Sequence, residues 1–110
     1  DLVIVHVEAP DEAAHLGSAV EKIKALERTD EHVVGPLLAA LRRHKEWRIL
    51  VAPDHVTSTA TTQHGAAPPP FCYAEHDVTS GGGECFCERA AAGAAVIETG
   101  EVLMRAFLGV

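Results

Sequence analysis

The sequence predicts an α/β fold in which a mostly parallel sheet is flanked by helices. Two short apolar runs, residues 2–7 and 47–52, contain several β-branched residues without polar alternation, which is typical of strands buried on both faces. Between them, apolar residues recur at helical spacing over about 18–44. A strand, a long helix and a second strand form the unit from which parallel sheets are built.

The predicted long helix has a start signal and one internal break. Ser18 followed by Glu21 fits a capping box, in which the hydroxyl caps the first turn and the carboxylate bonds back. Gly35-Pro36 interrupts the helix, but the apolar phase continues across the proline. The sequence therefore predicts one kinked helix or two abutting helices.

The second half of the chain predicts smaller elements. Residues 56–70 lack an apolar period and end in three prolines, which predicts a loop with an extended exit. We expect a short strand at 71–74 and a flexible turn at 81–83. Short helices are expected at 84–92 and 101–108.

Composition argues against several classes of function. The formal net charge is −7, and an acidic surface disfavours a nucleic-acid partner, which requires a basic patch. The chain has no apolar run long enough to span a membrane. Three cysteines without framework spacing favour reduced thiols in a cytoplasmic protein. Cys85 and Cys87 could ligate a soft metal, or could be two small side chains at a helix start.

Acidic and imidazole side chains follow both predicted strands. Asp11 and His15 are one helical turn apart, so both could reach one ion. Asp54 and His55 follow the second strand, and His64 comes nine residues later, across a loop long enough to fold back. Functional loops of parallel sheets lie beyond the carboxyl ends of the strands, and carboxylates and imidazoles bind divalent ions. The sequence therefore predicts a metal site at one edge of the sheet.

Each of these residues also has an ordinary structural interpretation. His15 could cap a helix or pack, Asp54 could be a turn residue after a proline, and His64 could be a surface residue. His6 and Glu8 would face the same side of the first strand, so they are candidates to support the metal ligands or to contact the substrate. A core histidine with one satisfied hydrogen bond is the alternative for this pair.

Three stretches cover nearly all of the chain: VHVEAPDEAAHLGSAVEKIKALERTDEHVVGPLL, ILVAPDHVTSTATTQHGAAPPPF and FCERAAAGAAVIETGEVLMRAFL. The first contains D-x-x-x-H, and the second contains D-H followed by a further His. Together they resemble the C-terminal part of the archaeal-type, cofactor-independent phosphoglycerate mutases, which belong to the alkaline phosphatase superfamily. The resemblance implies an alkaline-phosphatase-like fold, of which residues 1–110 form the C-terminal segment of the metal-binding domain, with the N-terminal remainder absent.

The resemblance implies a two-metal enzyme. It implies that Asp11, His15 and His64 hold one divalent ion and that Asp54 and His55 help to hold the other, each ion being Mn, Mg, Co or Zn. In the family, a phosphorylated serine and an N-terminal Asp complete the second site, and no Ser of this chain stands in the matching context. The implied reaction is the cytoplasmic, glycolytic interconversion of 3-phosphoglycerate and 2-phosphoglycerate through phosphoserine.

The chain alone, without a nucleophile, is then expected to be inactive on this small phosphorylated substrate and could self-associate through exposed apolar edges. It departs from the family at Ala14, Ser58, Thr62 and Ala67, where Gly, Pro, Arg and Asp are usual. The changes at 62 and 67 lie near the expected substrate. They leave two alternatives: a related two-metal phosphomonoesterase or phosphomutase, or a non-catalytic module that binds metal or a partner.

Overall fold

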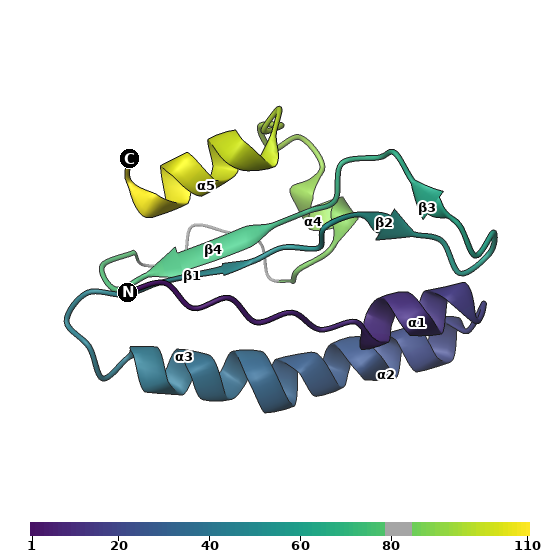
Figure 1. The fold of residues 1–110 in the computed structure, drawn as a ribbon, viewed down its shortest axis with the longest axis horizontal. Coiled ribbons are helices and arrows are strands. Elements are labelled where there is room, and N and C mark those ends of the chain that lie inside the picture. Colours follow the sequence, from purple (N-terminus) through teal and green to yellow (C-terminus); the bar gives the residue numbers. More distant parts are fainter. Residues whose placement is uncertain (79–84) are drawn as a thin grey trace. The chain divides into compact units, whose positions relative to one another are not determined.

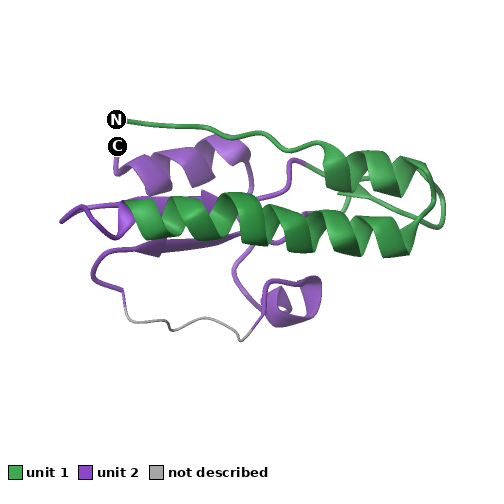
Figure 2. Ribbon diagram, turned by 90° about the horizontal axis from the view of Figure 1, so that it is seen from below, with its two compact units in different colours: residues 1–40, 55–67 green, residues 41–54, 68–110 purple. Residues whose placement is uncertain are grey.

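The computed structural model describes residues 1–78 and 85–110 (Figure 1). These residues divide into two compact units (Figure 2). The first unit contains Asp1–Ala40 and His55–Ala67, and the second contains Leu41–Asp54 and Pro68–Val110. The predicted turn at 81–83 lies outside the described residues.

The helices of the first unit follow one another closely along the chain. α1 (Ala9–His15) packs against α2 (Ala19–Thr29), and a π-helical turn (Asp30–Val34) leads from α2 directly into α3 (Gly35–Leu41). This confirms a long helix with one internal interruption, but the interruption lies at Asp30–Val34, directly before the predicted Gly35-Pro36. The π-turn precedes Pro36 because proline has no N–H to donate and its ring needs space in the preceding turn.

A tight connection joins α1 to α2. Gly17, with φ of +72°, and Ser18 donate their backbone N–H groups to the carbonyls of Ala14 and Ala13, at 2.9 and 3.1 Å, which is a Schellman motif. The Ser18 hydroxyl caps α2 by accepting from the Glu21 N–H at 3.2 Å. Only this half of the predicted capping box forms, because the Ser18 N–H is already used by the end of α1.

The sequence predicted a loop at residues 56–70, but this segment is not a loop throughout. They contain β2 (Val56–Thr57) and β3 (His64–Gly65), which pair antiparallel with Thr57 opposite His64. Two-residue strands are too short to produce a recognisable alternation of polar and apolar residues, so the pattern could not reveal them. The hairpin matters because it lies directly beside the candidate ligands.

The predicted strand at 2–7 is not a strand in the structure. A strand requires a neighbour to accept and donate its backbone hydrogen bonds, and the strands of the described residues pair only as β1 with β4 and β2 with β3. Both pairs are antiparallel, so the described part of the chain does not form the expected mostly parallel sheet. The apolar side chains of the segment stay exposed, by 79% for Val3 and 78% for Ile4.

The second unit contains the second predicted strand, β1 (Arg48–Val51), paired with β4 (Cys72–Glu75) in the register that sets Arg48 opposite Glu75. These strands confirm the predictions at 47–52 and 71–74. The Arg48 guanidinium donates to the Glu75 carboxylate at 2.8 Å and to the Phe107 carbonyl at 2.7 Å. Arg48 of β1 thereby connects β4 and α5 within this unit.

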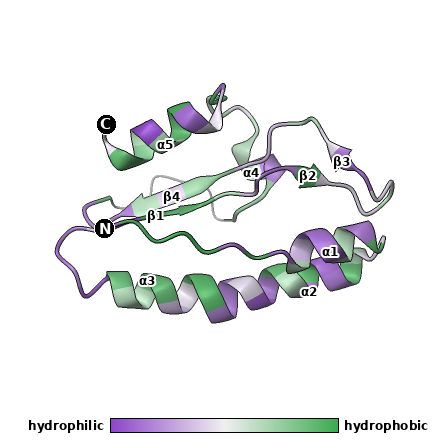
Figure 3. Cartoon of the chain, viewed as in Figure 1, coloured by the Kyte–Doolittle hydropathy of each residue, from purple (hydrophilic) through white to green (hydrophobic). Residues whose placement is uncertain are grey.

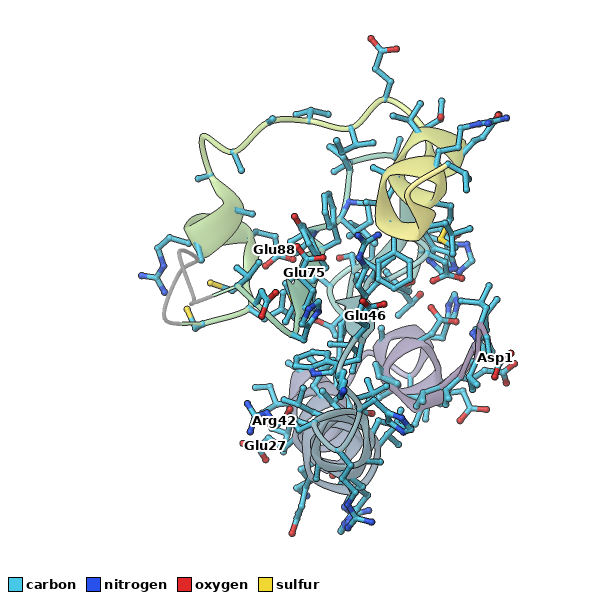
Figure 4. The ribbon with its side chains drawn as sticks, turned by 90° about the vertical axis from the view of Figure 1, so that its left-hand side faces the viewer. Asp1, Glu27, Arg42, Glu46, Glu75 and Glu88 are labelled. Carbon is cyan, nitrogen blue, oxygen red and sulfur yellow. The ribbon has the colours of Figure 1, made fainter. Side chains whose placement is uncertain are left out.

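Helices α4 (Glu88–Ala91) and α5 (Gly100–Leu108) complete the second unit. α5 agrees with the helix predicted at 101–108. α4 is shorter than the helix predicted at 84–92, because residues 85–87 are not helical and residue 84 lies outside the described residues. Acidic side chains are spread over both units, with Glu27 in the first and Glu46 in the second, as Figure 4 shows. In the described part of the chain, every helix is too short or too polar to cross a bilayer.

We propose that the chain self-associates through its exposed apolar segment at residues 2–7, which Figure 3 shows as a hydrophobic stretch. Replacing Val3 and Ile4 by Lys should shift the chain towards monomer, because like charges and lost apolar area both disfavour association. Sedimentation velocity over a concentration series measures this shift. A wild-type chain that stays monomeric at high concentration would contradict the proposal.

Candidate metal centre

Helix α1 brings Asp11 and His15 to the same side of one turn. Pro10 at the start of α1 pre-sets the first turn, and the acidic side chain of Asp11 in that turn complements the helix dipole. The His15 Nε2 lies 3.3 Å from the Asp11 Oδ2. The four-residue spacing therefore places both groups together, as the sequence predicted.

The β2–β3 hairpin and the residue directly before it supply two further imidazoles, His64 and His55. The His55 and His64 ring centroids lie 3.9 Å apart, and the His15 and His64 centroids lie 5.0 Å apart. The His15 and His64 Nε2 atoms are 3.1 Å apart. His64 therefore contacts both of the other rings.

The donor atoms of this cluster fit a divalent ion. Asp11, His55 and His64 each offer one ligand atom, and these atoms all lie within 4.8 Å of one another. Ligands at about 2.1 Å from a common ion lie roughly 3–4 Å apart, so small side-chain movements would satisfy coordination. His15 borders this cluster, because its Nε2 lies 3.3 Å from the Asp11 carboxylate and 3.1 Å from the His64 Nε2.

Thr57 holds two members of the cluster in place. Its side chain is almost completely buried, and its hydroxyl donates to the Asp11 Oδ1 at 2.6 Å. Because the single hydroxyl proton is used there, the His55 Nδ1–H donates to the same oxygen at 3.1 Å. This assigns the lone pair of His55 to Nε2.

A backbone carbonyl orients His15 in the same way. The His15 Nδ1 donates to the Thr62 carbonyl at 2.9 Å, which leaves its Nε2 as the atom that faces Asp11 and His64. Thr62 has a φ of +57°, a left-handed conformation that is uncommon for a β-branched residue, and its N–H donates to the Ser58 carbonyl at 2.7 Å. The turn of the hairpin is thus bent at the residue that orients His15.

The cluster stabilises a negative charge on Asp11. The hydrogen bond from Thr57 lowers the pKa of the Asp11 carboxyl, and the nearby His15, His55 and His64 rings lower it further. A carboxylate that is ionised, hydrogen-bonded and surrounded by imidazoles is prepared to bind a cation.

The structure does not bring every candidate together. Asp54 belongs to the second compact unit and is not a member of the cluster found in residues 1–78 and 85–110. The His6 Nε2 lies 3.5 Å from the Glu8 Oε1, and these side chains are 67% and 70% exposed. Neither belongs to the described cluster.

Sequence reasoning missed Thr57 and Thr62, which hold the ligands without being ligands themselves. Threonine is common in loops, and nothing in its spacing distinguishes a supporting hydroxyl. The Val56-Thr57 pair directly after His55 was the available signal, since two β-branched residues favour a strand that would fix the position of the histidine.

Comparisons with known proteins agree with a metal centre. Residues 1–101 match the model of the metalloenzyme superfamily. Three relatives are named 2,3-bisphosphoglycerate-independent phosphoglycerate mutase. The protein from Methanothrix thermoacetophila is 46% identical over 80% of this chain, and the one from Methanosarcina barkeri is 45% identical over 83%. The protein numbered 2 from Methanothermobacter thermautotrophicus is 53% identical over 64% of this chain.

The chain corresponds to 23%, 23% and 17% of the length of these relatives, so it spans less than a quarter of each. No solved structure matches it. The family match covers most of the sequence and includes every candidate ligand. The chain therefore belongs to the metalloenzyme superfamily.

Proposed function

We propose that this chain supplies metal ligands to a two-metal, cofactor-independent phosphoglycerate mutase that interconverts 3-phosphoglycerate and 2-phosphoglycerate. The observation that carries the proposal is the cluster of one carboxylate and three imidazoles in a chain of the metalloenzyme superfamily. The names of the relatives support the reaction. The nucleophilic serine of the reaction would come from residues outside these 110.

We assign the ligands as the family resemblance implies. Asp11, His15 and His64 would hold one ion, and Asp54 and His55 would help to hold the other. Two-metal centres keep their ions about 3.5–4 Å apart, so the ligands of both ions lie close together. The position of His55 beside His64 is compatible with neighbouring ions as well as with a single one.

The protein groups have distinct tasks in this proposal. Asp11 contributes a negative charge, and the Thr57 hydrogen bond and the neighbouring imidazoles lower the pKa of its carboxyl. Thr57 and the Thr62 carbonyl set the tautomers of His55 and His15, so that each presents a chosen nitrogen. Divalent ions held there would neutralise the charge of a transferring phosphoryl group.

The donor set is of mixed type, and Mn, Mg, Co or Zn could occupy it according to supply. The reaction would be a glycolytic step in the cytoplasm. An alkaline-phosphatase-like parallel sheet would form if the rest of the protein provided strands beside residues 2–7, which are apolar and unpaired in this structure.

A related phosphomonoesterase or phosphomutase is the second candidate. The observation in its favour is that Thr62 and Ala67 replace residues expected near the substrate, whereas the cluster keeps its ligands. Thr62 orients His15 through its backbone carbonyl, so this contact does not depend on the chemistry of the side chain at this position. A change of substrate would therefore leave metal binding intact.

The function is tested with the full-length protein that contains this chain, supplied with Mn²⁺ and 3-phosphoglycerate but without 2,3-bisphosphoglycerate. We expect 2-phosphoglycerate to form, and the Asp11→Asn variant to lose this turnover while His32→Ala, which lies outside the cluster, keeps it. Release of inorganic phosphate alone would favour the phosphomonoesterase. Metal binding without either product would leave only the non-catalytic module.

Removing a ligand should abolish most metal binding by this chain. His64→Ala should weaken Mn²⁺ affinity by more than roughly a hundredfold, because even a lost supporting partner costs about 10–100-fold. The signal of free Mn²⁺ in electron paramagnetic resonance reports the affinity, and His32→Ala is the matched control. Equal binding by His64→Ala and the control would show that the cluster is not the site.

Removing the supporting hydroxyl should have a smaller effect in the same assay. Thr57→Val keeps the shape of the side chain but loses the hydrogen bonds to Asp11 and His55, so Mn²⁺ affinity should fall roughly 10–100-fold. Thr57→Ser retains the hydroxyl and should bind nearly as the wild type does. An unaffected Thr57→Val variant would rule out this positioning role.

A further inference from the structure

Two cysteines outside the metal cluster lie in contact with each other. The Cys85 and Cys87 Sγ atoms are 3.4 Å apart and share a hydrogen bond. Cys87 occupies the N-cap position of α4 in extended backbone, with φ of −159° and ψ of 164°. Side chains two residues apart lie on the same side of an extended segment, and the extended backbone at Cys87 favours this contact.

Both thiols are accessible to small molecules. Cys85 is exposed and Cys87 is half-buried, and both are free in this structure. In residues 1–78 and 85–110, three metal-binding side chains lie together in the Asp11 cluster, which does not include these cysteines. A tetrahedral soft-metal site would therefore lack half of its ligands among the described residues.

The surroundings of the two sulfur atoms differ. The Ala90 backbone N–H lowers the pKa of the Cys87 thiol, and the hydrogen bond with Cys85 lowers it further. The same hydrogen bond raises the pKa of Cys85. Burial raises the pKa of Cys72, the third cysteine. Cys87 is therefore the thiol that ionises first, and Cys85 is placed to act second.

We propose that Cys85 and Cys87 form a redox-active dithiol that a low-molecular-weight disulfide, such as glutathione disulfide, converts into an intramolecular disulfide. The Cys87 thiolate attacks one sulfur of the small disulfide, which releases one thiol and leaves a mixed disulfide on Cys87. Cys85 then loses its proton and attacks the Cys87 sulfur, which releases the second thiol. Two protein thiols are oxidised, and one small disulfide is reduced to two thiols.

The geometry makes this disulfide reversible. It would close a loop of only three residues, so it constrains little of the unfolded chain and stabilises the protein weakly. Exposed disulfides of this kind are the readily reduced ones. The pair therefore responds to the ratio of thiol to disulfide in its surroundings and is not a structural staple.

The proposal is tested with the whole chain in glutathione buffers of graded ratio, with a chelator present to exclude metal-catalysed oxidation. After acid quenching and alkylation of the remaining thiols, peptide mass spectrometry locates each bond. We expect a Cys85–Cys87 disulfide in the wild type and in Cys72→Ser. Cys85→Ser should stop at the mixed disulfide on Cys87.

Rates give a second readout that a merely accessible thiol would not produce. Cys87→Ser should react with glutathione disulfide roughly tenfold more slowly than Cys85→Ser, because the thiol with the lower pKa is lost. The proposal is overturned if Cys85 and Cys87 stay alkylatable in oxidising buffer. It is also overturned if Cys72 is oxidised first, or if both single variants react at the same rate.

Discussion

The hydrogen bond from the Thr57 hydroxyl to the Asp11 carboxylate is the contact on which the metal centre depends. It connects α1 to β2 across 46 positions of sequence, and the same hydroxyl oxygen accepts a hydrogen bond from the His55 Nδ1. The Lys22 ammonium of α2 donates to the Thr57 backbone carbonyl at 2.6 Å, so a third element is fixed at the same residue. Burial of a threonine is tolerated only when its hydroxyl is satisfied, and here that requirement aligns two ligands.

The three imidazoles lie close together beside groups that hold them in place. The Asp11 carboxylate lies 3.3 Å from the His15 Nε2, and the Thr62 carbonyl accepts from the His15 Nδ1 at 2.9 Å. The described cluster is thus held by hydrogen bonds between its own members and their supports. These supporting hydrogen bonds keep the ligand side chains close to one another, as a cation would require.

Much of the fold and site could be predicted because the signals are local. The four-residue spacing of Asp11 and His15 needs only one helical turn, and the long helix and β1 follow from apolar periodicity. The strand expected at residues 2–7 was wrong because strand formation depends on a partner, which a local pattern cannot supply. The gathering of His55 and His64 depends on a hairpin of two-residue strands, and the sequence indicated only that the loop was long enough.

The π-turn at Asp30–Val34 has a consequence for which side of the long helix faces inward. Each residue of an α-helix is turned by about 100° around the axis relative to the one before it. A π-turn contains one additional residue, so every later residue lies on a different side of the helix than it would without the π-turn. Ala25 and Thr29 are half-buried before the π-turn, and Val34 and Leu38 are half-buried at its end and after it. In an uninterrupted α-helix, Pro36 would lie on the same side as Ala25 and Thr29, but it is exposed. The widened turn thus rotates the later residues around the helix axis, so that Val33, Val34 and Leu38 take the half-buried side and Pro36 does not.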